Sequence, residues 1–321
     1  MSTPAAVTVI VPGYNVAPYA QDALDSLLRQ SLENWTAILI DDTSTDATAA
    51  VFERAAAADS RFRVLRHEHR VGLGAARNVG LDLADTPFIA FLDADDLLTP
   101  RALDRLVGLL DQTGSDFALG AYVRLHPDSA GGYTVGDVQP WVAASTAPER
   151  RGTTIDEHPE ASGNIVAWSK VSRTDFWHRA KLRFPEGRLY EDQVVAQQMY
   201  ASARRFDTVP DVVAHWRIRA DGSSITQREA QLDVLRDCLE AMDAGLHVLE
   251  SAGHPLAGQA RIGQMLRMDV PRLAAIALAH PDSAYRRALG AFTREIWSRA
   301  GTARVSLDEA SGTAVAAARL W

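Results

Sequence analysis

The stretch Phe88-Ile-Ala-Phe-Leu-Asp-Ala-Asp-Asp96 joins five apolar residues to a cluster of three carboxylates. The run Phe88–Leu92 is too short for a helix and has the composition of a buried β-strand. Asp93, Asp95 and Asp96 repel one another and are costly to desolvate unless a cation or hydrogen-bond donors meet them. Carboxylates on a short loop suit Mg²⁺ or Mn²⁺, which keep coordination positions open for phosphate oxygens. The pattern indicates a metal or phosphate site, and the simpler alternative is a solvated turn whose aspartates cap the next helix.

Composition and charge narrow the class of protein. The chain has 321 residues, of which 47 % are hydrophobic and 23 % charged, as in ordinary globular proteins. The formal net charge of -8 argues against a nucleic-acid-binding protein, because no basic excess is available to contact phosphates. The single cysteine, Cys238, excludes an intrachain disulfide and is compatible with a reducing cytosol.

Two features of the sequence bear on where the protein works. The first residues, Met-Ser-Thr-Pro-Ala-Ala, carry no basic side chain and lead at once into strand residues, so we expect no signal peptide. No apolar run approaches the ~18 residues needed to span a bilayer. We therefore expect a cytoplasmic protein, one that could still act on a membrane-borne substrate by binding peripherally at the inner face of the membrane.

Apolar runs and one-sided helical patterns alternate over residues 7–112. The patterns predict strands at 7–11, 35–40, 62–65 and 88–92, and helices at 18–30, 44–58, 74–84 and 100–112. This alternation implies an α/β fold with a largely parallel sheet and helices on both faces. In such sheets ligands bind beyond the carboxyl ends of the strands. Polar clusters follow three of these strands, at Pro12-Gly-Tyr-Asn15, Asp41-Asp42 and Asp93-Ala-Asp95, so we expect them to converge on one edge.

The pattern loosens beyond Phe117 and changes again beyond Thr226. Residues 126–163 are rich in Gly, Pro, Ser and Thr and show no clear helix, which predicts loops and short strands. A helix is predicted at 191–203 and a strand at 212–218. After Thr226, apolar residues recur at helical spacing: Leu232, Leu235, Leu239, Met242 and Leu246. We therefore predict an α/β domain over residues 1–226 and a helical C-terminal region over residues 227–321.

A glycine pair precedes the third predicted helix. Gly72-Leu-Gly74 invites comparison with the dinucleotide-binding fingerprint, but Arg77 occupies the third glycine position and the glycines lie well after the strand end. The glycines still allow close backbone approach. Arg77 could reach a diphosphate or a nearby carboxylate, and pairing with a surface acid is an equally good interpretation.

A second pair of acids, Glu191-Asp192, follows the turn Phe184-Pro-Glu-Gly187 and begins a predicted helix. Free N–H groups at a helix N-terminus stabilise carboxylates as anions. An ionised carboxylate that faces a cleft is what a general base requires. Helix capping is the structural alternative, and these residues taken alone favour it slightly.

Taken together, these residues resemble the family-two glycosyltransferases of the GT-A fold. The resemblance covers roughly residues 5–226, and although each motif is loose, this many in the right order are specific. The motifs are Pro12-Gly-Tyr-Asn15, Asp41-Asp-Thr-Ser-Thr-Asp46, Gly72-Leu-Gly-Ala-Ala-Arg-Asn-Val-Gly80, Asp93-Ala-Asp-Asp96, Trp168-Ser-Lys-Val-Ser-Arg173, Phe184-Pro-Glu-Gly-Arg-Leu-Tyr-Glu-Asp192 and His215-Trp-Arg-Ile-Arg219 with Ser223-Ser224.

The resemblance implies a Rossmann-like GT-A fold and an enzyme of the hexosyltransferase type. Such an enzyme moves a sugar from a nucleotide donor, expected to be UDP-linked, to an acceptor hydroxyl with inversion, in a single displacement assisted by Mn²⁺ or Mg²⁺. The acceptor could be a glycan, a cell-wall polymer, a lipid-linked sugar or a small molecule. Residues 227–321 lie outside the resemblance, and we expect them to support the acceptor side or a homo-oligomer interface.

The resemblance also implies roles in donor binding. The residue matching Asp42 binds the donor base, and Pro12 and Tyr14 line the same pocket. Arg77 lies near the nucleotide. Asp93 faces the ribose or a metal-bound water.

Metal and catalytic roles follow in the same way. Asp95 ligates the metal that bridges the diphosphate. Because the leaving diphosphate carries negative charge, we expect Arg219 to add a cationic contact to it. Asp192 matches the catalytic base, with Glu191 beside it. The chain departs from the family at Thr43, where glycine is usual, so the geometry of that turn is open.

Two alternatives come from other classes of protein. A haloacid-dehalogenase-type phosphatase also places Asp-x-Asp after an apolar strand, but normally on the first strand rather than the fourth. A non-catalytic sugar-nucleotide-binding module would have kept the fold and lost the chemistry, and the presence of Asp95 and Asp192 weighs against it. Hydrolysis of small phosphate esters would favour the phosphatase, and donor binding without turnover would favour the binding module.

Overall fold

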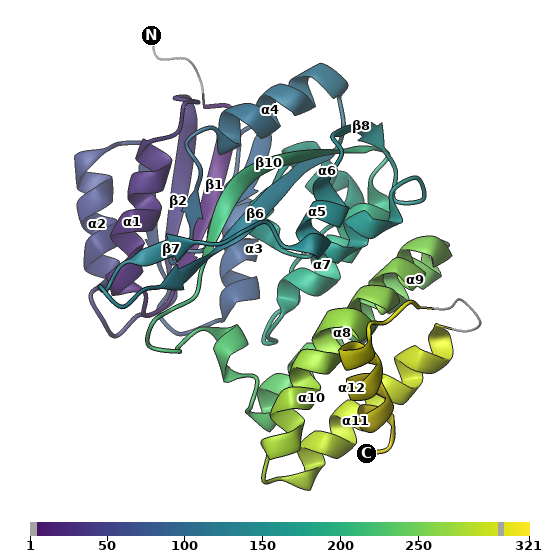
Figure 1. Ribbon diagram of the computed structural model, residues 1–321. Coiled ribbons are helices and arrows are strands. Elements are labelled where there is room, and N and C mark those ends of the chain that lie inside the picture. Colours follow the sequence, from purple (N-terminus) through teal and green to yellow (C-terminus); the bar gives the residue numbers. More distant parts are fainter. Residues whose placement is uncertain (1–4, 301–304) are drawn as a thin grey trace.

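The computed structural model describes residues 5–300 and 305–321. A mixed sheet lies at the centre of the larger part of the molecule (Figure 1). Its strands are β1 (Val7–Gly13), β2 (Trp35–Asp41), β3 (Phe62–Arg66), β4 (Phe88–Phe91), β5 (Leu97–Leu98), β6 (Phe117–Pro127), β7 (Tyr133–Val135), β8 (Arg150–Thr153), β9 (Lys170–Arg173) and β10 (Phe206–Arg217). They follow the order β3-β2-β1-β4-β9-β6-β10-β5, with β7 beside β6 and β8 beside β10.

Helices cover both faces of the sheet and make up most of the rest of the chain. Those that alternate with the strands are α1 (Ala17–Leu28), α2 (Thr48–Ala58), α3 (Leu73–Leu83), α4 (Ala102–Thr113), α5 (Pro140–Thr146), α6 (Thr174–Ala180) and α7 (Glu191–Ser202). The C-terminal ones are α8 (Leu232–Ser251), α9 (Pro255–Gln264), α10 (Val270–Ala279), α11 (Ser283–Arg299) and α12 (Glu309–Arg319).

The first four strands form the parallel part of the sheet. β1 pairs in parallel with both β2 and β4, and β2 pairs in parallel with β3. β9 then runs antiparallel between β4 and β6, and β10 returns parallel to β6. The α/β fold class is confirmed, and so is the presence of further helices at the C-terminus.

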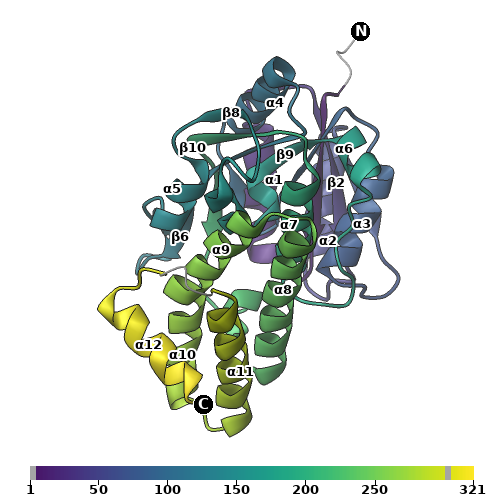
Figure 2. The same ribbon diagram turned by 90° about the vertical axis from the view of Figure 1, so that its right-hand side faces the viewer.

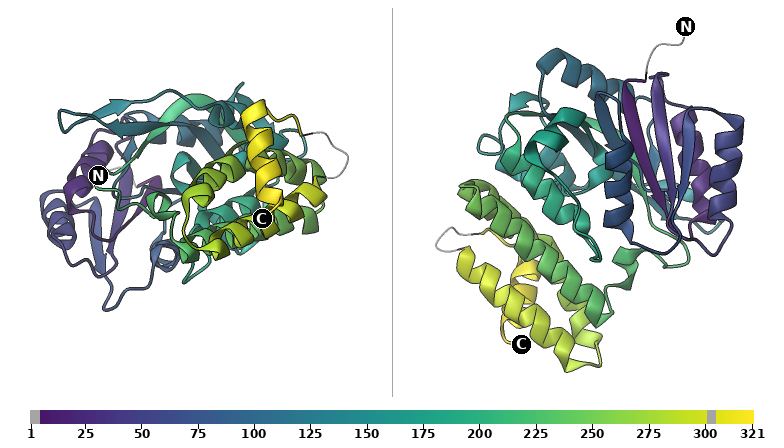
Figure 3. Two further views of the ribbon diagram at one scale, coloured as in Figure 1. Left: turned by 60° about the horizontal axis from the view of Figure 1, so that its bottom comes forward. Right: turned by 180° about the vertical axis from the view of Figure 1, so that it is seen from behind.

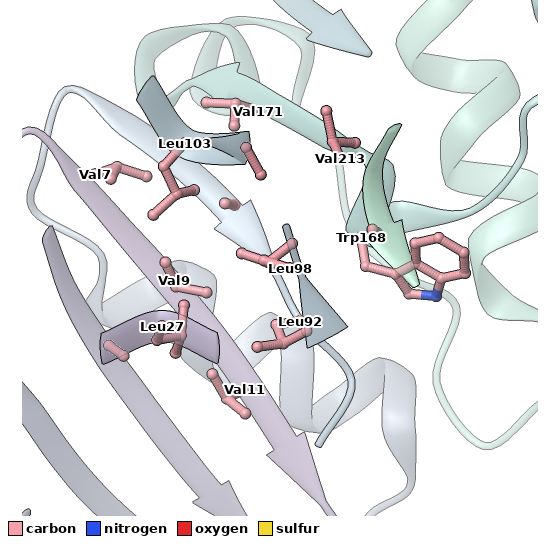
Figure 4. Packing of buried hydrophobic residues seen from close by; sticks show 14 of the residues in the cluster. Val7, Val9, Val11, Leu27, Leu92, Leu98, Leu103, Trp168, Val171 and Val213 are labelled. Atoms are coloured by element: carbon pink, nitrogen blue, oxygen red, sulfur yellow. The ribbon is translucent and has the colours of Figure 1, made fainter. Parts of the chain in front are cut away.

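Alternation along β1 divides the interior into two cores. Val7, Val9 and Val11 face the layer that contains α1, α2 and α4, where Leu27 packs beside them (Figure 4). Ile10 points to the opposite face and joins the core that α3, α6 and α7 cover. Successive side chains of a strand point to opposite faces, so one apolar run supplies both cores.

The C-terminal helices gather on one side of the sheet domain (Figures 2 and 3). α8 packs along α7, and α9 packs against the 3₁₀ turn Pro159–Gly163. The helices also enclose a core of their own, which includes Leu235, Met242, Leu266 and Leu289. Among all described residues, no helix combines the length and the apolar character needed to cross a membrane.

Three elements differ from the sequence-based expectation. β6 is a long buried strand in a stretch where the sequence pattern loosens, and α6 is a helix that the sequence pattern does not predict. α5 lies inside residues 126–163, where no helix was expected. Helices of this length carry too few turns to show a clear apolar stripe, which explains why both were missed.

Candidate active site

The carboxyl ends of β1, β2 and β4 are joined by backbone hydrogen bonds. The Asp42 amide donates to the Gly13 carbonyl over 3.0 Å, and the Ala94 amide donates to the Pro12 carbonyl over 3.4 Å. Pro12 and Gly13 therefore lie between the loop that follows β2 and the loop that follows β4. The structure brings the three polar clusters to one edge of the sheet, as their positions after parallel strands predict.

Asp42 organises the loop that follows β3. Its carboxylate contacts His67 Nδ1 at 2.9 Å and accepts hydrogen bonds from the amides of Val71 at 2.9 Å and Gly72 at 2.8 Å. Burial alone would raise the pKa of Asp42, but these hydrogen bonds lower it below its usual value. Asp42 is therefore an ionised, fixed acceptor at the end of β2.

The turns beside Asp42 contain two residues in left-handed backbone conformations. Asn15 has φ 52° and its side chain accepts a hydrogen bond from the Thr45 amide at 2.8 Å. Thr43 has φ 61°, so a threonine adopts the conformation that glycine takes most easily. Next to them Tyr14 is half-buried, with the guanidinium of Arg70 3.9 Å from the centre of its ring.

Arg77 connects the acidic cluster after β4 with the acidic pair at the start of α7. It projects from α3, and its side chain is only 1 % exposed. One nitrogen lies 2.5 Å from Asp93 Oδ1 and another lies 2.5 Å from Glu191 Oε1. A buried guanidinium requires such counter-charges, and the two carboxylates raise the pKa of Arg77 in return. Arg77 thereby ties the loop after β4 to the first residue of α7.

Glu191 and its predecessor fix the start of α7. Tyr190 has φ 59°, a left-handed conformation that a residue other than glycine rarely adopts. Glu191 is buried, and burial raises the pKa of its carboxyl to about 7 while Arg77 opposes the shift. Glu191 is thus held by the ion pair with Arg77 and is closed off from solvent.

Asp192 has different surroundings. It is half-buried, and no side chain among residues 5–300 and 305–321 donates a hydrogen bond to its carboxylate. Burial raises the pKa of Asp192 to about 6, Arg77 and Lys170 lower it, and Asp93 raises it. The backbone amide of Gln193 also lowers this pKa. The carboxylate therefore ionises near neutral pH and accepts no side-chain hydrogen bond, which suits a general base.

Lys170 is a site residue to which sequence reasoning gave no role. Its ammonium group is buried and donates to Asn164 O at 2.8 Å, Asn164 Oδ1 at 2.8 Å and Val166 O at 2.6 Å. Burial lowers the pKa of Lys170 to about 7, and Asp192 opposes this shift. The available signal was a lysine inside the otherwise uncharged stretch Trp168-Ser-Lys-Val-Ser172.

Two arginines at the end of β10 hold the loop that follows β4. Arg219 Nε pairs with Asp95 Oδ2 at 2.7 Å. Arg217 Nε donates to the Asp95 carbonyl at 2.8 Å, and the Arg217 amide donates to Asp96 Oδ1 at 2.7 Å. Sequence reasoning singled out Arg219 and missed Arg217, which is the last residue of β10.

The loop after β4 offers the carboxylates of Asp93 and Asp95 as ligands for a divalent cation. In the described part of the chain, no three His, Cys, Asp or Glu side chains converge as a complete ligand cage. Burial and the nearby charge of Asp93 raise the pKa of Asp95, while Arg219 lowers it. A cation would relieve this repulsion, and Mg²⁺ typically takes one or two carboxylates and completes its shell with phosphates and water. Asp95 therefore fits the ligand role that the resemblance implies.

Comparison with known sequences identifies the family. A sequence model described as "Glycosyl transferase family 2" matches residues 8–169, about half of the chain. The chain belongs to glycosyl transferase family 2. The match includes the strand-end clusters and Arg77, and it ends just before Lys170.

Relatives in the same family cover more of the chain. The putative glycosyltransferase EpsH of Bacillus subtilis is 32 % identical over 71 % of this chain and 64 % of its own length. Glycosyltransferase GlyA of Streptococcus pneumoniae is 27 % identical over 78 % of this chain and 35 % of its own length. The chain thus spans less than two thirds of either relative.

Solved structures show the same fold. The S. aureus TarS 1-349 structure in complex with UDP-GlcNAc has a TM-score of 0.75 at 21 % identity, over 98 % of this chain and 89 % of that one. The mannosyltransferase PcManGT from Pyrobaculum calidifontis, solved with GDP-Man and Mn²⁺, has a TM-score of 0.55 at 19 % identity, over 99 % of this chain and 87 % of that one. The TarS likeness extends into the C-terminal helices, beyond the family match.

Proposed function

We propose that this family-2 chain transfers a hexose from a UDP-linked donor to an acceptor hydroxyl, with inversion at the anomeric carbon. The observation that carries the proposal is the arrangement around Arg77, which fixes Asp93 and Glu191 while the neighbouring Asp192 stays without a side-chain donor. TarS, which shares the fold, was solved with UDP-GlcNAc. WfgD of Escherichia coli is named as a UDP-Glc-dependent glucosyltransferase and is 32 % identical over 38 % of this chain and 48 % of its own length.

The nucleotide is placed at the edge formed by β1, β2 and β4. Asp42 accepts from the donor base through a lone pair not used by its three protein contacts. Pro12 and Tyr14 line the same pocket, and Asp93 faces the ribose. Protein groups already hold the carboxylates of Asp42 and Asp93. The nucleotide-sugar therefore binds to side chains whose positions are fixed beforehand.

Cleavage of the glycosidic bond leaves negative charge on the diphosphate. Arg219 lies at the same loop and can present its guanidinium to that charge. A Mn²⁺ or Mg²⁺ ion held by Asp95 would supply further positive charge to the leaving group. Arg217 keeps the loop in place through backbone contacts and needs no contact with the donor.

Asp192 acts on the acceptor. Its carboxylate accepts the proton of the acceptor hydroxyl while that oxygen attacks the anomeric carbon from the face opposite the leaving group. One displacement inverts the configuration and requires no covalent nucleophile. Arg77 and Lys170 keep the pKa of Asp192 from rising further, so that the carboxylate is ionised at neutral pH.

We also propose the class of acceptor and the division of the chain. WfgD is named for an acceptor linked to diphosphoundecaprenol, so lipid-linked sugars and cell-wall polymers are the first acceptors to test. A lipid-linked acceptor would bring the protein to the inner membrane face. Residues 1–226 form the donor-binding domain, and residues 227–321 form a helical region on the acceptor side that is also available for a homo-oligomer interface.

Release of nucleoside diphosphate from nucleotide-sugars tests the proposed reaction without a known acceptor. We expect release from a UDP-sugar with Mn²⁺ or Mg²⁺ and loss of release with a chelator. Asp95→Ala should lose metal-dependent UDP binding in calorimetry and keep its thermal transition, while Asp111→Ala, an exposed acid on α4, keeps both. Equal UDP affinity with and without chelator contradicts the role of Asp95, and hydrolysis of small phosphate esters in place of UDP-sugars contradicts the reaction.

A further inference from the structure

The segment that precedes Glu191 is bonded to the C-terminal region. Asp237 on α8 accepts a hydrogen bond from the Leu189 amide at 3.2 Å and pairs with Arg188 at 3.2 Å. Glu229, just ahead of α8, accepts a hydrogen bond from the Tyr190 hydroxyl at 3.1 Å. Backbone and side-chain contacts therefore both reach the residues that lead into α7.

The segment that follows Asp192 is bonded to the same region. Arg261 on α9 donates to Gln193 Oε1 at 3.0 Å, and both side chains are buried. The same guanidinium donates to Gln264 Oε1 at 2.8 Å, so its position is set within the C-terminal helices. A Cβ atom added to Gly245 on α8 would lie 3.4 Å from the Gln193 carbonyl, which shows how closely α8 approaches α7.

The partners of these contacts are themselves fixed. Glu229 is 5 % exposed, forms an ion pair with Arg272, and its carbonyl accepts a hydrogen bond from the Tyr285 hydroxyl at 2.8 Å. The Tyr190 ring packs against the apolar core of the C-terminal helices. Glu229 and Tyr190 are therefore held by the C-terminal helices.

The backbone of Tyr190 is what these contacts hold in place. A left-handed residue other than glycine persists only where its surroundings determine its conformation. At φ 59° Tyr190 sets the direction in which the chain enters α7, and the carboxylates of Glu191 and Asp192 follow directly. Relaxation of this one residue would redirect both.

We propose that the C-terminal helices position the catalytic base. Glu229, Asp237 and Arg261 form a clamp on residues 189–193, and these three residues act through the backbone and side chains that carry Asp192 rather than by touching substrate. The proposal rests on the function proposed above for Asp192. It gives residues 227–321 a part in the reaction, beyond support of the acceptor.

Two substitutions open the clamp at separate points, and a third serves as a matched control. Tyr190→Phe removes the hydroxyl bonded to Glu229, and Gln193→Met removes the oxygen bonded to Arg261. Gln197→Met changes the same residue type one turn along α7, where the side chain is 2 % exposed and donates to Ser162 O at 2.8 Å in the sheet domain. All three lose one hydrogen bond, but the control loses none to the C-terminal helices.

Hydrolysis of UDP-GlcNAc in the presence of Mn²⁺ provides the kinetic measurement. A displacement of a reacting group by 1 Å can reduce the rate by ~10²-fold. Each variant removes only one of the contacts of the clamp, so we expect a smaller displacement and a fall in kcat of about tenfold in Tyr190→Phe and in Gln193→Met. KM for UDP-GlcNAc should stay unchanged in both, because the donor pocket lies at the strand ends. Gln197→Met should keep the kcat of the wild type.

Hydrogen exchange provides a measurement that needs no activity. We expect the amides of residues 189–193 to exchange faster in the two clamp variants than in the wild type and in Gln197→Met. Unchanged kcat in both folded clamp variants, an equal fall in Gln197→Met, or unchanged exchange would each overturn the clamp. Asp192→Asn at wild-type kcat would instead overturn the proposed base, and the exchange result alone would then decide whether the clamp exists.

Discussion

Adjacent carboxylates at the start of α7 differ in what surrounds them. Glu191 is closed off by its ion pair with Arg77, whereas Asp192 has charges near it and no side chain bonded to it in the described part of the chain. Two neighbouring carboxyl groups in different environments typically have different roles in an active site. This difference agrees with the proposed roles, in which Glu191 fixes the segment and Asp192 is the base.

Asp192→Asn is expected to separate catalysis from stability. The amide keeps the shape of the side chain and loses its basicity, so transfer should fall by about 10²–10⁴-fold. Donor affinity should stay near that of the wild type, because the proposed base touches the acceptor rather than the nucleotide. The melting temperature should also stay near that of the wild type, because no described side chain donates a hydrogen bond to the carboxylate. Turnover, calorimetry and thermal melting on one sample check this. If Asp192 only caps the helix, stability falls by about 1 kcal/mol and turnover per folded molecule is preserved.

Glu191→Gln is expected to show the opposite pattern. Arg77 would keep Asp93 as its only carboxylate partner, and hydrogen bonds to buried charged groups contribute roughly 2 kcal/mol each. The free energy of unfolding should fall by about that amount, while the loss of turnover should be smaller than in Asp192→Asn. Urea denaturation measures the first and nucleoside-diphosphate release the second. Unchanged stability would contradict the structural role of this ion pair.

The pH dependence of transfer follows from the same environment. Burial raises the pKa of Asp192 from 3.8 to about 6, and the base is active only as the anion. The rate of transfer should therefore be maximal well above pH 6 and fall about tenfold per pH unit below it. A profile of kcat at saturating donor measures this midpoint. A midpoint near pH 4 would mean that the base lies in a solvated site elsewhere.

The sequence allows some site residues to be predicted and not others. Asp42, Asp93 and Asp95 each follow a strand of the parallel sheet, so topology alone brings them to one edge. Arg217 could not be assigned in this way, because its contacts with Asp95 and Asp96 depend on β10 lying beside β5, far away in the sequence. Lys170 bonds to residues close in the sequence, Asn164 and Val166, but the burial of its ammonium group has no local signal. No local periodicity encodes those partners.

Local signals likewise explain which elements were predictable. β1 to β4 combine apolar runs with turn residues at both ends, and each lies within two residues of its predicted bounds. β6 contains Ala118, Gly120 and Ala121, which lack the bulk that marks a strand. Gly120 is required there, because a Cβ atom would lie 2.4 Å from Val213 on β10. The reason for these small residues is visible only once the neighbouring strand is known.

α3 packs so closely against the turn before α7 that a methyl group at Gly74 would have no room. A Cβ atom on Gly74 would lie 2.1 Å from the Pro185 carbonyl, so Gly74→Ala must separate α3 from that turn. We expect a loss of about 1–3 kcal/mol in the free energy of unfolding, measured in urea, and a fall in turnover as Arg77 moves. Gly108→Ala on α4 meets no atom within 4 Å and should gain about 0.5–1 kcal/mol. If the two variants have equal stability, α3 does not pack as described.

The sheet domain and the C-terminal helices share part of one hydrophobic interior. Leu249 on α8 and Ala257 on α9 belong to the same buried cluster as Val195 and Met199 on α7. In return, Tyr190 packs against the core of the C-terminal helices. The two parts of the chain are therefore joined by buried apolar contacts as well as by the clamp.

This shared interior predicts a single cooperative unfolding transition. In calorimetry the sheet domain and the C-terminal helices should melt together, with equal calorimetric and van't Hoff enthalpies. Leu249→Ala should cost about 2–5 kcal/mol and shift the whole transition rather than split it. Two separate transitions in the wild type would show that the two parts unfold independently.

Burial of α7 on both sides has a consequence for how such proteins can be recombined. Gln193 accepts a hydrogen bond from Arg261 in the C-terminal helices, and Gln197 donates one to Ser162 in the sheet domain. The side chains of α7 therefore have to fit both parts of the molecule. A hybrid that joins two relatives at Thr226 would disrupt this fit, whereas a junction ahead of Arg188 would transfer α7 together with its partners. Acceptor preference and the base segment should therefore be inherited as one unit, and breakpoints between family members should avoid the interval from 188 to 226.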